Sequence, residues 1–114
     1  MNPIRPTLSL RWKSLRWQVP VDRILYADSY GRHVTVHTET ETYEVVGKLS
    51  DLQTALEAHG FLRIHQSFLV NMRYIAGFLS GSVVLFDRTE IPLSARKRAQ
   101  ALRRYDAWLA ESNE

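Results

Sequence analysis

An apolar stretch in the middle of the chain, residues 61–71, is interrupted by five polar side chains. They are Arg63, His65, Gln66, Ser67 and Asn71. All five can hydrogen-bond, and a protein core must satisfy every such group that it buries. So many hydrogen-bonding groups at one bend indicate that part of this segment faces a binding partner.

Other residues that could carry catalysis or bind metal are scattered. The four histidines are His33, His37, His59 and His65. His33 and His37 would lie about 13 Å apart in a strand, and no pair has a trustworthy metal-ligand spacing. The sequence has no Gly-rich phosphate loop, nucleophile elbow or paired carboxylates in an apolar setting. It has no cysteine, which excludes disulfides and thiolate metal sites. We therefore expect no enzymatic activity, no small-molecule substrate, no cofactor and no metal.

Composition indicates one globular domain spanning residues 1–114, with 45% hydrophobic and 24% charged residues. Without a membrane span or a secretory signal, we expect no membrane association and a cytoplasmic location. The net charge of +3 is unevenly distributed. Residues 1–37 carry six basic against two acidic side chains, residues 38–62 one against five, and residues 63–114 eight against five. This polarity suits a protein with one face turned toward a polyanion.

The first half of the chain predicts mostly strands. Apolar residues alternate over 8–12 and 15–19, and Lys13-Ser14 shifts the phase, as a hairpin turn or a bulge would. Strands are also expected over 21–27, 34–36 and 42–46, with a turn at 28–31. A short helix should follow, with Ser50 and Gln53 as a capping box and Gly60 after its end.

The second half predicts strands near 74–79, 83–86 and 90–93, then a helix over 95–110 capped by Ser94. Asn71 is expected to brace the turn that leads into Tyr74. The apolar residues of this half should form the core: Phe61, Phe68, Val70, Ile75, Phe78, Val83, Leu85 and Phe86. The fold class is therefore mainly β, with a short internal helix and a C-terminal helix.

Four segments resemble the conserved stretches of the LytTR family of DNA-binding domains, and they occur in the family's order. They are 24–33, 48–52, 61–71 with the pattern F-x-R-I-H-x-S-(aromatic)-x-V-N, and 91–96 with the sequence I-P-L-S-A-R. The resemblance covers about residues 15–109. It implies an elongated, β-sandwich-like domain that contacts DNA through loops. Such domains are usually the output half of bacterial two-component response regulators and pair on repeated half-sites, which implies self-association on DNA.

The resemblance also implies three base contacts, at His33, Gln66 and Arg96. Chemistry supports each position. Arginine can bond bidentately to guanine, and glutamine to adenine, although Gln66 departs from the Asn or Arg often found there. Arg96 lies at the start of a predicted helix, which attracts phosphate. Histidine can donate to a base or a phosphate.

Phosphate contacts, which orient a protein on the duplex, are expected from Arg32, Arg63, His65 and Lys97. Two alternatives remain open. The chain could be a β-rich protein-interaction module without nucleic-acid binding. RNA binding is less favoured, because the sequence lacks the aromatic clusters that stack unpaired bases.

Overall fold

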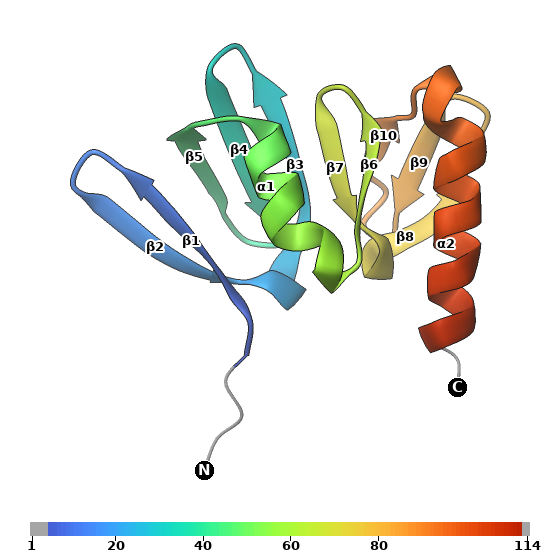
Figure 1. Cartoon of the computed structure of the whole chain (residues 1–114), viewed down its shortest axis with the longest axis horizontal. Coiled ribbons are helices and arrows are strands. Elements are labelled where there is room, and N and C mark those ends of the chain that lie inside the picture. The colour runs from blue at the N-terminus through green and yellow to red at the C-terminus, as the bar shows by residue number, and fades with distance from the viewer. Residues whose placement is uncertain (1–4, 113–114) are drawn as a thin grey trace.

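A computed structural model describes residues 5–112, so the predicted domain limits, 1 and 114, lie outside it. Its centre is an antiparallel sheet of five strands (Figure 1). In spatial order these are β5 (Thr42–Val46), β4 (His33–Thr38), β3 (Ile24–Tyr30), β7 (Phe68–Asn71) and β6 (Phe61–His65). The antiparallel pairing brings the turns between consecutive strands to the two ends of the sheet.

One face of the sheet is covered by an N-terminal hairpin and a short helix. The hairpin consists of β1 (Thr7–Trp12) and β2 (Leu15–Pro20), and the helix is α1 (Leu49–Leu56). Both elements place leucines against the sheet in a common core cluster. These leucines are Leu8, Leu10, Leu49, Leu52 and Leu56. The expected hairpin is confirmed, with Lys13-Ser14 as its turn.

The other face packs against a three-stranded sheet and the C-terminal helix (Figure 1). The elements of this layer are β8 (Ile75–Phe78), β9 (Ser82–Leu85), β10 (Glu90–Pro92) and α2 (Arg98–Ser112). Helix α2 contributes buried Ala101 and the partly buried rings of Tyr105 and Trp108. The layers form a mainly β sandwich, as the sequence predicts, and the molecule measures 41 × 41 × 24 Å.

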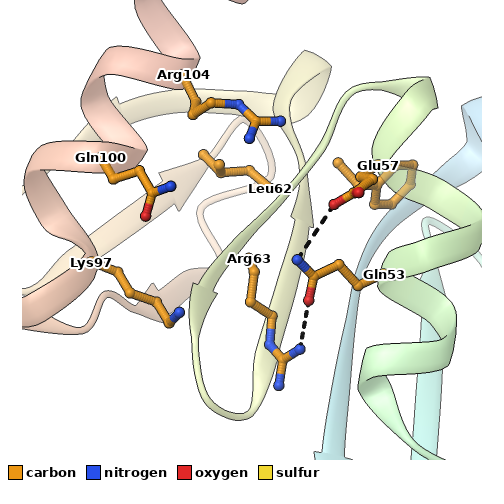
Figure 2. Close-up of a pocket in the computed structure, with 8 residues that line it drawn as sticks. Gln53, Glu57, Leu62, Arg63, Lys97, Gln100 and Arg104 are labelled. Carbon is orange, nitrogen blue, oxygen red and sulfur yellow. Dashed lines mark hydrogen bonds between the residues drawn. The ribbon is translucent and has the colours of Figure 1, made fainter.

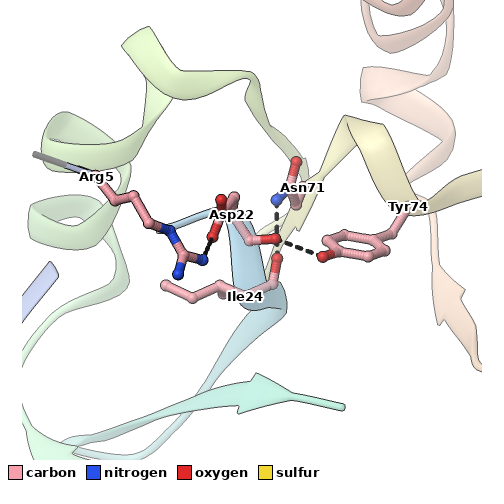
Figure 3. Close-up of polar contacts among 5 residues, drawn as sticks. All are labelled: Arg5, Asp22, Ile24, Asn71 and Tyr74. Carbon is pink, nitrogen blue, oxygen red and sulfur yellow. Dashed lines mark hydrogen bonds and ion pairs between the residues drawn. The ribbon is translucent and has the colours of Figure 1, made fainter. Parts of the chain in front are cut away.

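Asn71 ties the two layers together at the end of β7 (Figure 3). Its side chain is 2% exposed, donates to the backbone oxygen of Ile24 at 2.9 Å and accepts from the backbone N–H of Arg73 at 3.2 Å. The Tyr74 hydroxyl then donates to the backbone oxygen of Asp22. The predicted bracing role of Asn71 is confirmed, because its bonds hold the turn that leads into β8.

The strand predicted over residues 21–27 was wrong at both ends. Residues 28–30 belong to β3, since Asp28 pairs with Thr35 on β4 and with Phe68 on β7. Pairing on both sides outweighs the turn preference of Asp and Ser, and the turn is confined to residues 31–32. Residues 21–23 form a single 3-10 turn, not a strand.

The predicted capping box of α1 was wrong, and Ser94 occupies the expected N-cap position without a side-chain capping bond. Helix α1 begins at Leu49, so Ser50 lies within its first turn, and Lys48 precedes it without a side-chain capping bond. Gln53 bonds to Arg63 and does not close a capping box. Ser94 precedes a single 3-10 turn, residues 95–97, and its side chain forms no capping bond either.

One predicted core residue lies outside the core. Phe86 is 71% exposed, because β9 ends at Leu85 and Phe86 starts the following turn. Phe68 and Phe78 are partly buried, and the other predicted core residues are buried.

Candidate nucleic-acid interface

Two of the predicted contact bends lie side by side at one end of the central sheet. Strand β3 pairs with both β4 and β7 in antiparallel fashion, so the β3–β4 turn and the β6–β7 turn share that end (Figure 1). The backbone N–H of Ser29 donates to the backbone oxygen of Ser67 at 3.1 Å. A direct hydrogen bond therefore fixes the spacing of the bends that carry His33 and Gln66.

The third bend, between β10 and α2, joins the same end through a second backbone bond. The N–H of Ser94 donates to the oxygen of Ile64, near the end of β6, at 2.8 Å. Arg96 follows in the 3-10 turn that precedes α2. We call these three bends, residues 30–33, 65–68 and 93–97, the loop edge.

Within the loop edge the three predicted base-contacting residues differ in exposure. Gln66 and Arg96 are exposed. The His33 side chain is 42% exposed, and its Nε2 lies 3.9 Å from a carboxylate oxygen of Glu44. Its ring meets the edge of the Trp12 ring, with 5.9 Å between centroids. His33 is therefore held partly by neighbours from two other strands.

Arg63 holds the β6–β7 turn by hydrogen bonds to the turn backbone, and it also bonds to Gln53 on α1 (Figure 2). Its Nε donates to the His65 oxygen at 2.9 Å, its Nη1 to Gln53 Oε1 at 2.8 Å, and its Nη2 to the Gln66 oxygen. Partial burial lowers the pKa of the Arg63 guanidinium, which remains charged at neutral pH. Among the described residues these bonds occupy three of its five N–H groups, and two are left for a phosphate.

His65 also organises this turn. Its Nδ1 accepts the backbone N–H of Ser67 at 3.0 Å, and its ring packs edge-on against Phe68. When neutral, a ring that accepts at Nδ1 carries its proton on Nε2. Nε2 is therefore the atom with which His65 can donate to a phosphate.

Cations gather around a hollow of about 170 Å³ between α1 and α2 (Figure 2). Arg63, Lys97 and Arg104 line it, against the single carboxylate of Glu57. Lys97 is half-buried there. The excess of positive charge favours an anion in this hollow beside β6.

A larger concavity, of about 490 Å³, lies between the β3–β4 turn and the loop from β5 to α1. Arg32, Lys48 and Arg63 line it, and no described acidic side chain does. Arg32 is exposed, while its backbone oxygen accepts the N–H of Gly47 at 2.9 Å. The sequence analysis did not identify Lys48 as part of the site. Strand direction could have done so, because β5 runs parallel to β3 and ends beside the same turn.

No group of three or more His, Cys, Asp or Glu able to hold a metal occurs among residues 5–112. In the same range no helix is both long and apolar enough to cross a membrane. The geometry offers exposed hydrogen-bonding groups flanked by cations, which suits an anionic polymer.

Comparison with known proteins agrees with this geometry. The model of the LytTr DNA-binding domain matches residues 15–105. The chain is 36% identical over 55 residues to the transcriptional regulatory protein NatR of Bacillus subtilis, covering 48% of this chain and 24% of NatR. It is 32% identical over 76 residues to the sensory transduction protein LytT of the same organism, covering 62% and 32%. The matches thus span only a quarter to a third of these relatives.

A solved LytTr DNA-binding domain from Bacillus cereus has the same fold. It superposes with a TM-score of 0.73 at 18% identity, covering 86% of this chain and 94% of the other. The matched region contains all three bends of the loop edge, since it runs from residue 15 to residue 105. The chain belongs to the family of LytTr DNA-binding domains.

Proposed function

We propose that this domain binds double-stranded DNA in a sequence-specific manner, as the cytoplasmic DNA-binding part of a bacterial transcription regulator. The observation that carries the proposal is the loop edge itself. Three bends are linked by two backbone hydrogen bonds and flanked by concavities rich in Arg and Lys. Cationic surroundings supply affinity for the phosphate backbone, and protruding polar side chains supply discrimination.

The proposed base contacts are His33, Gln66 and Arg96. The exposed guanidinium of Arg96 can bond bidentately to O6 and N7 of guanine, and the exposed amide of Gln66 to N6 and N7 of adenine. His33 can donate from Nε2, provided that a base competes successfully with Glu44. Because the bends are adjacent but distinct, the three side chains would enter neighbouring grooves.

The proposed phosphate contacts are Arg32, Arg63, His65 and Lys97. Arg32 and Lys97 line the two concavities beside the bends, where their charge can reach the backbone on either side of the base contacts. Arg63 and His65 would contribute through the donors that the β6–β7 turn leaves unused. A domain of this size covers few base pairs. We therefore propose that two copies associate on repeated half-sites.

Selection of preferred duplexes from a random pool tests the proposal most directly, because it measures binding and specificity together. On the selected site, Arg96→Ala should cost about 1–3 kcal/mol in binding and relax the preference at one base position. Arg103→Ala is the matched control. Arg103 lies on α2 about 200° around the helix from buried Ala101, so it faces away from the core, outside the bends.

Three outcomes would count against the proposal or a part of it. An equal loss on selected and scrambled DNA would make Arg96 a phosphate contact. A loss with Arg103→Ala as large as with Arg96→Ala would make the effect one of net charge. Absence of any salt-sensitive binding to duplex DNA would refute the function as a whole and favour a protein-interaction module.

A further inference from the structure

The β1–β2 hairpin is a rigid arm. Its strands pair along their whole length, from Thr7 opposite Pro20 to Trp12 opposite Leu15. Lys13 takes a positive φ of 58° in the two-residue turn. Arg16 Nη1 donates to the backbone oxygens of Lys13 and Leu15, both at 2.9 Å. These bonds hold a turn that lacks the usual Gly or Asn.

The base of the arm is buried in the core, whereas its tip is largely exposed and contacts the core mainly through Trp12. Leu8, Leu10 and Val19 are at most 6% exposed. Further along the same face, Leu15 is 51% and Trp17 45% exposed, so the tip extends beyond the surface that the base covers. Figure 1 shows the hairpin splayed outward, with its turn on the side where the β3–β4 turn lies.

The charge of the arm is of one sign. Residues 7–20 contain three basic side chains, Arg11, Lys13 and Arg16, and no acidic one. Arg11 and Arg16 are exposed and directly opposite each other across the two strands. Like charges in directly opposed positions destabilise a hairpin, so this arrangement gains from an anionic partner.

Ring contacts join the tip to the loop edge. Trp12, the last residue of β1, packs edge-on against His33 with ring planes at 80°. The Nζ of Lys13 lies 5.1 Å from the centre of the Trp12 ring. A duplex that reaches His33 would therefore pass close to the cations of the tip.

We propose that the β1–β2 hairpin is a fourth DNA-contacting element. This proposal rests on the proposed function. It also goes beyond that function, because residues 7–14 precede the region that matches the family model. Arg11 and Lys13 contact phosphates on the flank of the site nearest His33, and Arg16 maintains the shape of the turn. The arm adds affinity and length to the contacted segment without adding base preference, because phosphates carry no sequence.

The double substitution R11Q/K13Q tests this proposal, because glutamine removes both charges and leaves Arg16 in place. The slope of log affinity against log salt should fall by about 1.8, or 0.9 for each lost phosphate contact. The hydroxyl-radical footprint on the selected duplex should shorten at one end only, and the preferred sequence should stay the same.

The matched control is R23Q/R73Q, which removes the same charge from two exposed arginines near the opposite end of the sheet. Its salt slope and footprint should equal those of the wild type. K13Q alone, outside the strand pairs, should give about half the change in slope, which covers the case in which the double variant fails to fold.

If R11Q/K13Q and K13Q both keep the salt slope and the footprint of the wild type, the arm proposal is overturned while the proposed function stands. An equal slope change in R23Q/R73Q would also overturn it, since the effect would then follow net charge. If the wild type itself shows no salt-dependent duplex binding, the proposed function fails and the arm proposal fails with it.

Discussion

Replacing Arg63 by alanine tests how the β6–β7 turn is held in shape. The guanidinium donates to the backbone oxygens of His65 and Gln66 and to the side chain of Gln53. A protein hydrogen bond contributes about 1 kcal/mol net, and water can solvate the turn carbonyls in the variant. We therefore expect the free energy of unfolding to fall by about 2–3 kcal/mol. Chemical denaturation of the wild type and the variant measures this loss.

The same variant also tests the proposed phosphate contact, through a different observable. Loss of one phosphate contact lowers the slope of log affinity against log salt by about 0.9. Loss of the brace lowers affinity for the selected site but leaves the slope unchanged, because no charge leaves the interface. Gln53→Ala weakens the support of Arg63 without a change of charge, since it removes the bond to Arg63 together with a 3.5 Å bond from Gln53 Nε2 to Glu57. It should cost about 1 kcal/mol of stability and leave the slope at its wild-type value.

Two results would refute the reasoning. If Arg63→Ala changes the free energy of unfolding by less than about 0.5 kcal/mol, the bonds to the turn do not brace it. If the salt slope of Arg63→Ala equals that of the wild type, its remaining donors do not reach a phosphate. Arg63→Lys is informative in both cases. It keeps the charge for a phosphate but loses the planar group that bonds three acceptors at once.

Asn71→Ala leaves two backbone groups unpaired near the core and should lower the free energy of unfolding by about 2–4 kcal/mol, as chemical denaturation would show. Gly60→Ala places a Cβ at φ +86° and 3.1 Å from Trp108 Nε1. The substitution should lower the free energy of unfolding by about 1–2 kcal/mol. The loss should exceed that of Gly31→Ala, where φ is +61° and no atom lies within 4 Å. Burial raises the pKa of Tyr74 above its ordinary value of 10. The raised pKa therefore stabilises the folded protein fully below pH 10, and this stabilisation is lost as pH rises through the folded-state pKa. Tyr74→Phe should reduce the fall in the free energy of unfolding at alkaline pH, which denaturation at several pH values measures.

Much of the architecture follows from local patterns in the sequence. The alternation on either side of Lys13-Ser14 predicts the hairpin, because only a turn or a bulge restores the phase of buried residues. Gly60 marks the end of the helical segment, and its φ of +86° shows why glycine stands there. Asn71 was predicted as a brace, since an amide among apolar residues must find partners.

The errors occurred where non-local contacts decide the local structure. Asp28 has strong turn preference, yet strands on both sides hold it in β3. Gln53 fits a capping pattern, but its amide oxygen bonds instead to Arg63, ten residues further along. Phe86 has a core residue's side chain and lies just past the last residue of β9. Local propensity depends neither on non-local partners nor on where a strand ends, so it could not predict these three outcomes.

The meeting of the β3–β4 and β6–β7 turns depends on a non-local pairing. Because β3 pairs antiparallel with β7, the two hairpins lie side by side with their turns at the same end of the sheet. The position of the third bend depends on a bond from Ser94 to Ile64, which no sequence pattern indicates. The occupied donors of Arg63 were equally hidden, because two of its acceptors are backbone oxygens.

The same backbone bonds bear on how specificity would arise. Ser29 to Ser67 and Ser94 to Ile64 fix the distances between the three bends, and the turns themselves are short. A straight duplex that does not match those distances must bend or change groove width, because the protein edge has little freedom to adapt. The cost of that deformation depends on the base steps between the contacts. Bases that no side chain touches would therefore influence affinity alongside those proposed to face His33, Gln66 and Arg96.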